Sequence, residues 1–430
     1  MTRACVIPRL MMTDTDKIML TRQDCAALDV ADDLAGLREA FSLPEGVIYL
    51  DGNSLGPLPK AAVATLSDTI TREWGEGLIR SWGDADWFTL PERLGDRLGR
   101  IIGAAPGQVV VCDCTSINIY KALRAAMDLR PGRHVIVSET SSFPTDLYMI
   151  EGAIQAGHQY QTRLVGRDGN DVAALLDDQV AAVVLSNVDY RTGRLIDMEQ
   201  VTRQAHAAGA LVIWDLCHSA GVIPVDLDAI GADFAVGCTY KYLNAGPGAP
   251  AFIYVNSRHH DMARQPLSGW WGHAAPFAFE QGYRPTGGVR RFLSGTQSIL
   301  ALKGVEAALD VFDGLDIAAI RRKSQKLCDT FIALVAAHPD CTALRMVSPP
   351  EAADRGSQVS FDFDEGFAVV QAMIAKGVIG DFREPGIMRF GFAPYYLRFV
   401  DVFDAVEIMA EAMRAKVWTN PEFQVRGTVT

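Results

Sequence analysis

The sequence lacks the features of a membrane protein and of a nucleic-acid-binding protein. Its apolar runs are far shorter than the roughly 20 residues that a membrane-spanning helix needs. Basic residues are outnumbered, with 40 Lys and Arg against 52 Asp and Glu, and the net charge is −12. This balance argues against binding to DNA, RNA or an anionic lipid surface. No internal repeat or low-complexity tract is present, so the chain is not a repeat protein.

The sequence also lacks the cysteine pattern of a zinc site. Eight cysteines are scattered along the chain, and most lie in apolar runs, as reduced cysteines in a protein core do. Cys112 and Cys114 have no second Cys or His pair nearby, so no metal is expected. Scattered reduced cysteines are typical of a reducing compartment, and we expect the protein to be cytoplasmic.

What the chain does contain is an alternation of apolar strands and amphipathic helices through its middle. Strands are expected at 108–112, 134–138, 180–186, 210–215 and 234–237, and helices at 115–128, 146–156 and 198–208. Strands that are apolar throughout and alternate with helices predict a parallel sheet covered on both faces. Residues 251–255 are expected to close this sheet, antiparallel to the rest. Ligands of such sheets bind beyond the carboxyl ends of the strands.

The pattern changes after Gly295. Long helices are expected at 300–312, 317–338, 367–376 and 400–416, and strands at 358–363, with one exposed face, and 386–392. The change predicts three parts: residues 1–65, an N-terminal segment that packs with the small domain; residues 66–304, a large domain; and residues 305–430, a small α+β domain. Residues 1–20 do not form a signal-peptide core, because prolines and charges interrupt them, and they are expected to be an extension or to precede the true start.

The most specific chemical signal lies between Leu211 and Asn244. An apolar strand ends at Asp215, and Lys241 follows 26 residues later between two tyrosines, Tyr240 and Tyr242. A lysine in this setting suits covalent attachment of pyridoxal phosphate. A carboxylate would keep the pyridine nitrogen of that cofactor protonated, so that the ring can accept electrons. Taken alone, the same two residues are also compatible with a helix cap and a lysine that reaches solvent.

Two helix starts in the expected sheet could contact such a cofactor. Thr115 and Ser116 open a helix directly after a strand, where backbone amides and hydroxyls make an anion site for a phosphate. Phe143 could stack on a flat ring, and Asp146 could accept a hydrogen bond at its rim. The alternatives are an ordinary helix cap at Thr115 or Ser116, with nothing bound, and a proline-initiated helix at Pro144.

Two motifs late in the chain complete the set. Ser268–His273 places two tryptophans in a glycine-flanked loop, which suits an aromatic ligand or a subunit contact, although loop tryptophans are often core residues. Arg389 lies in an apolar strand, and no acidic residue is closer in the sequence than Glu384. A lone buried guanidinium is costly, so we expect an unpaired Arg389 that binds the α-carboxylate of a substrate. The alternative is an ion pair with a carboxylate of the protein.

Together these motifs resemble the fold-type I pyridoxal-phosphate enzymes of the class V aminotransferase group, and in detail the bacterial kynureninase family. The resemblance runs from about residue 22 to the C-terminus. The matching stretches are 49–56 (YLDGNSLG), 78–82, 115–118, 143–146, 215–221, 237–244 (GCTYKYLN), the Gly269-Trp270 loop and Arg389. It implies an α/β fold, the fold-type I PLP-dependent transferase fold, with a mostly parallel large domain. It also implies hydrolysis of L-kynurenine, with 3-hydroxykynurenine as a second substrate, to anthranilate and L-alanine in the kynurenine pathway of tryptophan catabolism and NAD biosynthesis.

The resemblance also assigns roles to residues. Lys241 would carry the cofactor, Asp215 would pair with its ring nitrogen, and Tyr240 would act as the acid that protonates Cβ. The cofactor-binding set would be Thr115, Ser116, Phe143, Pro144, Thr145, Asp146, Ser186, Asp215, His218, Tyr240 and Lys241, joined by Trp270 and Thr296 from the partner subunit of a homodimer. The substrate-binding set would be Arg389, Trp82 and Ser54. The tryptophan at position 82 favours kynurenine over 3-hydroxykynurenine. Cys217 stands where the family usually has alanine, and Ser186 where bacterial relatives often have threonine.

Three other functions share part of this pattern. A cysteine desulfurase or selenocysteine lyase needs a reactive cysteine on a mobile loop late in the chain, whereas Cys328 is expected within a helix and Cys341 just after one. An aminotransferase would reveal itself by forming a 2-oxo acid. A regulator that binds pyridoxal phosphate without turnover would need a DNA-binding segment or a basic patch, and neither is evident.

Overall fold

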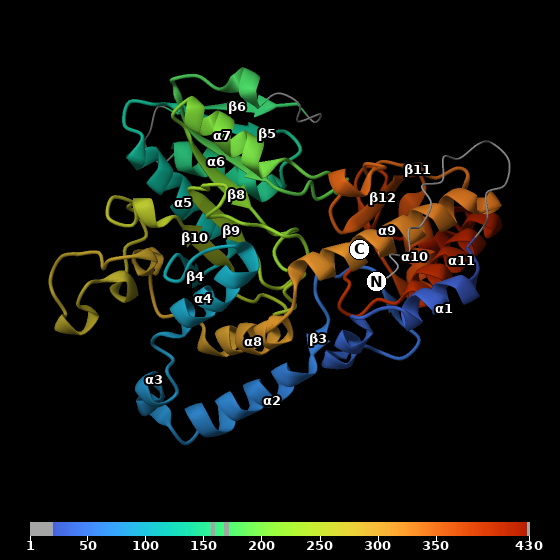
Figure 1. Cartoon of the computed structure of the whole chain (residues 1–430), viewed down its shortest axis with the longest axis horizontal. Coiled ribbons are helices and arrows are strands. Elements are labelled where there is room, and N and C mark those ends of the chain that lie inside the picture. The colour runs from blue at the N-terminus through green and yellow to red at the C-terminus, as the bar shows by residue number, and fades with distance from the viewer. Residues whose placement is uncertain (1–19, 156–159, 167–171, 428–430) are drawn as a thin grey trace, which may run out of the picture.

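The computed structural model describes residues 20–155, 160–166 and 172–427. A sheet of seven strands forms the centre of its larger unit, which Figure 1 shows beside a smaller unit. The order is β4-β10-β9-β8-β7-β5-β6. The strands are β4 (Val109–Val111), β5 (Val135–Glu139), β6 (Gln161–Val165), β7 (Val180–Ser186), β8 (Leu211–Asp215), β9 (Phe234–Gly237) and β10 (Phe252–Val255). β10 pairs antiparallel with both β4 and β9, and the other described strand pairs of this sheet are parallel. The expected antiparallel direction is therefore confirmed, but β10 does not close the sheet, because β4 lies beyond it.

Helices cover both faces of this sheet, as the continuous apolar strands predict. Successive residues of β4 point to opposite sides, so that Val109 and Val111 join one buried cluster while Val110 joins the other. Helices α5 (Thr115–Leu129) and α6 (Pro144–Gln155) contribute side chains to the cluster of Val110, and α4 (Leu90–Ile102) and α7 (Met198–Ala207) to the opposite one. Both faces are therefore buried, and ligands can reach only the ends of the strands.

A smaller antiparallel sheet lies beside the large one, with the order β11-β12-β15-β14. Its strands are β11 (Arg345–Met346), β12 (Gln358–Asp362), β14 (Asp381–Arg383) and β15 (Ile387–Gly391), and its helices are α9 (Ile317–Ala337), α10 (Gly366–Ala375) and α11 (Phe399–Ala415). The expected exposed face of β12 is wrong. Phe361 packs against Phe331 of α9, and Gln358 on the other face donates to the backbone oxygen of Tyr190 at 3.1 Å. Helix α9 therefore covers one face of β12, and the large unit covers the other.

The N-terminal segment packs on this smaller unit. Arg22, which begins α1 (Arg22–Val30), pairs with Asp404 of α11 at 2.7 Å. Asp29 accepts hydrogen bonds from the first backbone amides of α11, at 2.6 Å from Phe399 and 3.0 Å from Val400. Strand β2 (Ile48–Tyr49) pairs in parallel with β13 (Val378–Ile379). Segments from the two ends of the sequence therefore form one unit.

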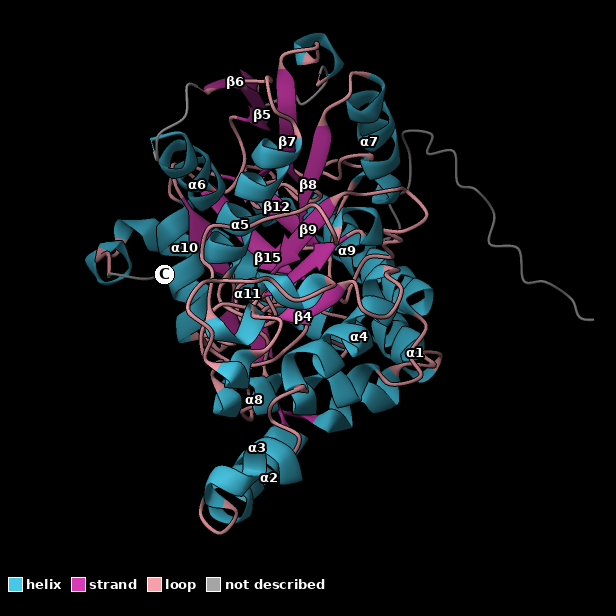
Figure 2. Ribbon diagram, turned by 90° about the vertical axis from the view of Figure 1, so that its left-hand side faces the viewer, coloured by secondary structure: helices cyan, strands magenta, loops and turns pink. Residues whose placement is uncertain are grey.

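Beyond this segment, α2 (Lys60–Asp68) and α3 (Ser81–Asp84) extend away from the body of the molecule (Figure 2). Helix α2 packs beside α8 (Ile299–Leu309). The proposed domain boundary at 304/305 falls inside α8, and the division of the chain at 65/66 and 304/305 stays a prediction. The predictions that the N-terminus holds no signal-peptide core and that it precedes the true start concern residues that lie outside the described part. Within the described part, no helix is both long and apolar enough to cross a membrane.

Candidate active site

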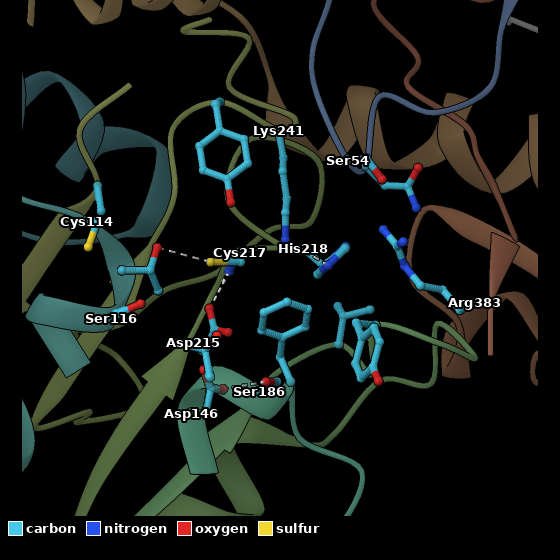
Figure 3. Close-up of a pocket in the computed structure, with 18 of the residues that line it drawn as sticks. Ser54, Cys114, Ser116, Asp146, Ser186, Asp215, Cys217, His218, Lys241 and Arg383 are labelled. Carbon is cyan, nitrogen blue, oxygen red and sulfur yellow. Dashed lines mark hydrogen bonds between the residues drawn. The ribbon is translucent and has the colours of Figure 1, made fainter. Parts of the chain in front are cut away.

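A cavity of about 300 Å³ opens at the carboxyl ends of β7 and β8, and side chains of the small sheet also line it (Figure 3). Its wall combines the N-terminal segment, the large sheet and the small sheet. It is lined by Asn53, Ser54, Cys114, Thr115, Ser116, Phe143, Thr145, Asp146, Ser186, Val188, Tyr190, Asp215, Cys217, His218, Tyr240, Lys241, Ala249, Ala251, Arg383 and Arg389. Most of the residues expected at the site therefore meet in one place.

Lys241 extends into the middle of this cavity. It follows β9, and its Nζ lies 3.0 Å from Nε2 of His218 and 5.9 Å from the centre of the Phe143 ring. Burial and the nearby Lys241 charge hold the pKa of His218 well below its usual value, so the imidazole is neutral at physiological pH. Nδ1 of His218 has no hydrogen-bond partner among the described residues. The amine is thus held by a neutral ring above a flat aromatic face.

Two buried carboxylates lie on one side of Lys241. Asp215 ends β8 and accepts a hydrogen bond from the backbone amide of Cys217 at 2.7 Å. Asp146, in the first turn of α6, accepts one from Ser186 Oγ at 3.4 Å. Burial, and next the charge of Asp215, raise the pKa of Asp146 well above its usual value. A cation placed at this pair would relieve the repulsion, and the protonated ring nitrogen of pyridoxal phosphate is such a cation.

The start of α5 provides a place for a phosphate. Cys114 precedes the helix in an extended conformation, and its side chain makes no capping bond to the first amides. The hydroxyls of Thr115 and Ser116 line the same cavity. Uncapped amides, the positive end of the helix dipole and two hydroxyls together form an anion site. The phosphate site, the carboxylate pair, the Phe143 ring and Lys241 all fit pyridoxal phosphate.

Arg389 is not the unpaired cation that the sequence predicts. It is 2% exposed, and its Nη2 forms an ion pair with Asp381. Nη2 also donates to Ser54 Oγ at 2.8 Å, and Nη1 to the backbone oxygen of Tyr190 at 2.7 Å. The expectation of an empty guanidinium awaiting a substrate is wrong because Asp381, eight positions earlier in the sequence, lies directly opposite on the neighbouring strand. The role of Arg389 in substrate binding stays a prediction.

Four of the predicted site residues do not line this cavity: Trp82, Pro144, Trp270 and Thr296. Pro144 begins α6, beside the lining residues Phe143 and Thr145. Trp82 packs edge-on against Trp271, with ring centres 5.4 Å apart. Trp270 and Thr296 are exposed on the surface of this subunit. Their assigned roles stay predictions.

Three polar residues that line the cavity were not predicted from the sequence: Asn53, Tyr190 and Arg383. Asn53 belongs to the YLDGNSLG motif beside Ser54, so the motif itself was a signal. Arg383 alternates with Asp381 along a strand, but that strand has only three residues and no apolar pattern. Tyr190 lies in a turn after β7 and gave no signal.

Known proteins match the chain in sequence and in fold. A sequence profile described as the kynureninase C-terminal domain matches residues 320–409. The kynureninase of Burkholderia pseudomallei (strain 1106a) is 54% identical over 417 residues, which is 96% of this chain and all of the relative. The kynureninase of Pseudomonas fluorescens is 53% identical over the same shares.

The solved structures with a similar fold are more distant in sequence. The cysteine desulfurase CsdA of Escherichia coli superposes with a TM-score of 0.76 at 18% identity, over 89% of this chain and 99% of the other. The cystine C-S lyase C-DES, in a mutant with glycine covalently linked to its PLP cofactor, gives 0.75 at 16% identity, over 87% and 99%. At these identities the likeness extends to the fold alone.

Proposed function

The chain belongs to the kynureninase family, and on that premise we propose that it hydrolyses the Cβ–Cγ bond of L-kynurenine with pyridoxal phosphate, yielding anthranilate and L-alanine in tryptophan catabolism. One observation carries the proposal for this chain. Lys241, the carboxylate of Asp215, the anion site at Thr115 and the guanidinium of Arg389 line a single cavity. These are the groups needed to hold a phosphorylated cofactor and an amino-acid substrate together.

Pyridoxal phosphate, when bound, supplies an electron sink for the electrons released at the substrate Cα. The residues of the chain handle the protons. Lys241 lies against the neutral imidazole of His218, so its amine can take the α-proton and return it. Tyr240 lines the cavity beside Lys241, so its phenol can donate a proton to Cβ. Burial raises the pKa of this phenol, which keeps it protonated at neutral pH and also makes it a weaker acid.

A cysteine desulfurase activity is disfavoured although desulfurases share the fold. Cys328 and Cys341 are buried in the smaller unit, and burial raises the pKa of each to about 12. Neither can be a thiolate at neutral pH. Cys114 is the exposed cysteine within the described ranges, and it lies beside Thr115 at the anion site, not on a late loop. Carbon–carbon cleavage is therefore the better proposal.

Product analysis tests this function. The purified protein with pyridoxal phosphate is expected to convert L-kynurenine into equal amounts of anthranilate and L-alanine, and to turn over 3-hydroxykynurenine more slowly. Anthranilate fluorescence and amino-acid chromatography measure the two products. Formation of a 2-oxo acid in place of anthranilate would identify an aminotransferase, and a holoenzyme without any turnover would point to a regulator.

We also propose a homodimer with two-fold symmetry, and a cytoplasmic location on the ground of the scattered reduced cysteines. The observation that supports the dimer is exposed apolar surface on two segments: Val63, Ile70, Trp74, Leu78 and Ile79 along and just after α2, and Trp270, Phe277 and Phe279 in and after the loop of the two tryptophans. An apolar groove of about 610 Å³, lined by residues that include Leu58, Leu66 and Leu300, runs along the base of α2. Exposed apolar side chains on two segments, next to an apolar groove, indicate a protein contact, and a second copy of the chain is the occupant we propose.

Subunit mixing tests whether the site is shared. Lys241→Ala and Thr296→Asp subunits are each expected to be inactive as homodimers. A mixed dimer holds one site in which both residues are intact, so random mixing should restore about a quarter of the sites, and purified mixed dimers about half. Turnover after mixing measures the recovery. No recovery in verified mixed dimers, or a fully active monomer, would contradict the shared site.

A further inference from the structure

One carboxylate organises two arginines at the wall of the cavity. Asp381 and Arg383 alternate along β14, so their side chains share a face of the small sheet, and Asp381 lies opposite Arg389 of β15. A single oxygen of Asp381, Oδ2, pairs with both guanidinium groups, at 2.8 Å from Arg383, and accepts from Ser54 Oγ at 2.9 Å. The other oxygen, Oδ1, has no partner within the described ranges.

The donors of Arg389 are largely committed to the protein. A guanidinium presents two forks of parallel N–H groups, and each fork uses one hydrogen of Nη2. In Arg389, Nη2 donates both to Asp381 and to Ser54, while Nη1 donates to the backbone of Tyr190. The donors that remain are Nε, which has no partner among the described residues, and one hydrogen of Nη1. These N–H groups lie on different edges of the guanidinium, so Arg389 alone cannot bind a carboxylate through two parallel hydrogen bonds.

Arg383 keeps more free donors than Arg389. Its Nη2 pairs with Asp381, its Nη1 has one long contact of 3.5 Å with the backbone oxygen of Phe382, and each of these two nitrogens has a second hydrogen. Its side chain is 35% exposed, against 2% for Arg389, and it lines the cavity across from the Asp215–Asp146 pair (Figure 3). We propose that Arg383 is a second carboxylate-binding residue, which shares the substrate α-carboxylate with Arg389, and that Asp381 positions both guanidinium groups. The proposal deepens the kynureninase function proposed above and rests on it.

The charges around the two arginines are compatible with an added carboxylate. Asp51 is another acidic residue close to this pair, and burial, followed by the charge of Asp381, raises the pKa of Asp51 to about 6. A further negative charge would raise that pKa again and favour uptake of a proton by Asp51. The cluster can therefore accept the charge of a substrate without retaining three ionised carboxylates beside two cations.

Binding of L-alanine to the holoenzyme tests the role of Arg383. Alanine carries the α-carboxylate, whereas L-alaninamide lacks it, and both are followed by the change in cofactor absorbance. Arg383→Gln is expected to weaken alanine binding by roughly 10- to 100-fold, the effect of losing hydrogen bonds to a charged group, and to leave alaninamide unchanged. KM for kynurenine should rise more than kcat falls, and Arg383→Lys should recover part of the loss.

The matched control is Arg345→Gln, which removes an arginine of the same sheet that pairs with Asp362 and does not line the cavity. It should leave alanine binding and turnover unchanged. Wild-type alanine affinity in Arg383→Gln would overturn the inference. Weaker binding of anthranilate together with unchanged binding of alanine would also overturn it, because Arg383 would then bind the aryl carboxylate of the product. Failure of wild-type protein to release anthranilate would refute the proposed function instead.

Asp381→Asn tests the positioning role separately. Without the carboxylate charge, both guanidinium groups lose their common partner, so alanine binding should weaken while alaninamide binding does not. Thermal unfolding of the same variant measures any structural damage. A lower Tm with unchanged alanine affinity would show that Asp381 only stabilises the sheet, and this part of the inference would be wrong.

Discussion

Lys241→Ala is expected to abolish kynurenine turnover, with a loss of roughly 10⁴-fold or more, as for removal of a covalent catalytic residue. The amine lies 3.0 Å from His218 at the centre of the cavity, and no other lysine is among the described residues that line it. The variant therefore loses both the attachment point of the cofactor and the base that moves the α-proton. Borohydride treatment of the wild-type holoenzyme should fix the cofactor on the peptide that contains Lys241, as measured by mass spectrometry.

Lys376→Ala is the control for this experiment. Lys376 pairs with Glu411 on the surface of the smaller unit, away from the cavity. The control variant should keep normal turnover and labelling. A label on another lysine, or appreciable turnover by Lys241→Ala, would contradict the assignment.

Asp215→Asn is expected to lower kcat by at least roughly 100-fold, corresponding to about 3 kcal/mol of transition-state stabilisation. Asparagine keeps the shape of the side chain and can still accept from the amide of Cys217, but it cannot hold a positive charge on the ring nitrogen. The cofactor should therefore remain bound after dialysis while turnover collapses. Cofactor content and kcat, measured on the same preparation, separate these two effects.

Asp146→Asn provides the matched comparison. Asp146 is also buried at the end of the cavity, but its pKa is raised, so an amide resembles the form that this residue already favours. Its loss of kcat should be clearly smaller than that of Asp215→Asn. Equal losses in the two variants, or near-normal rates in Asp215→Asn, would contradict the distinct role of Asp215.

The sequence predicts the large sheet well because its strands are buried on both faces. The expected strands at 180–186 and 234–237 coincide with β7 and β9, since an uninterrupted apolar run between polar residues marks both ends. Strand β6 was not expected, because it lies at the edge of the sheet and its sequence QTRLV is largely polar and exposed. Edge strands lack the burial that makes a strand visible in sequence.

The site is predictable where function follows directly from a strand end. Asp215, Ser186 and Lys241 each lie at or just beyond the end of a buried strand, so local sequence locates them. The Asp381–Arg389 pair could not be found in this way. It depends on the register between two short strands, which no local pattern specifies. The proposed roles of Trp270 and Thr296 present a different difficulty, because a contribution from another subunit would leave no trace within one chain.

The packing of the N-terminal segment on the smaller unit constrains the order in which the chain can fold. Residues that leave the ribosome first, from Arg22 to Tyr49, find their partners in β13 and α11, which are made last. The large sheet, by contrast, is complete once β10 has been synthesised. We therefore expect the large sheet to form during synthesis, while helix α1 remains without its packing partners until α11 has been made. The cavity between the sheets, and with it the ability to bind ligands, would arise only after the chain is released.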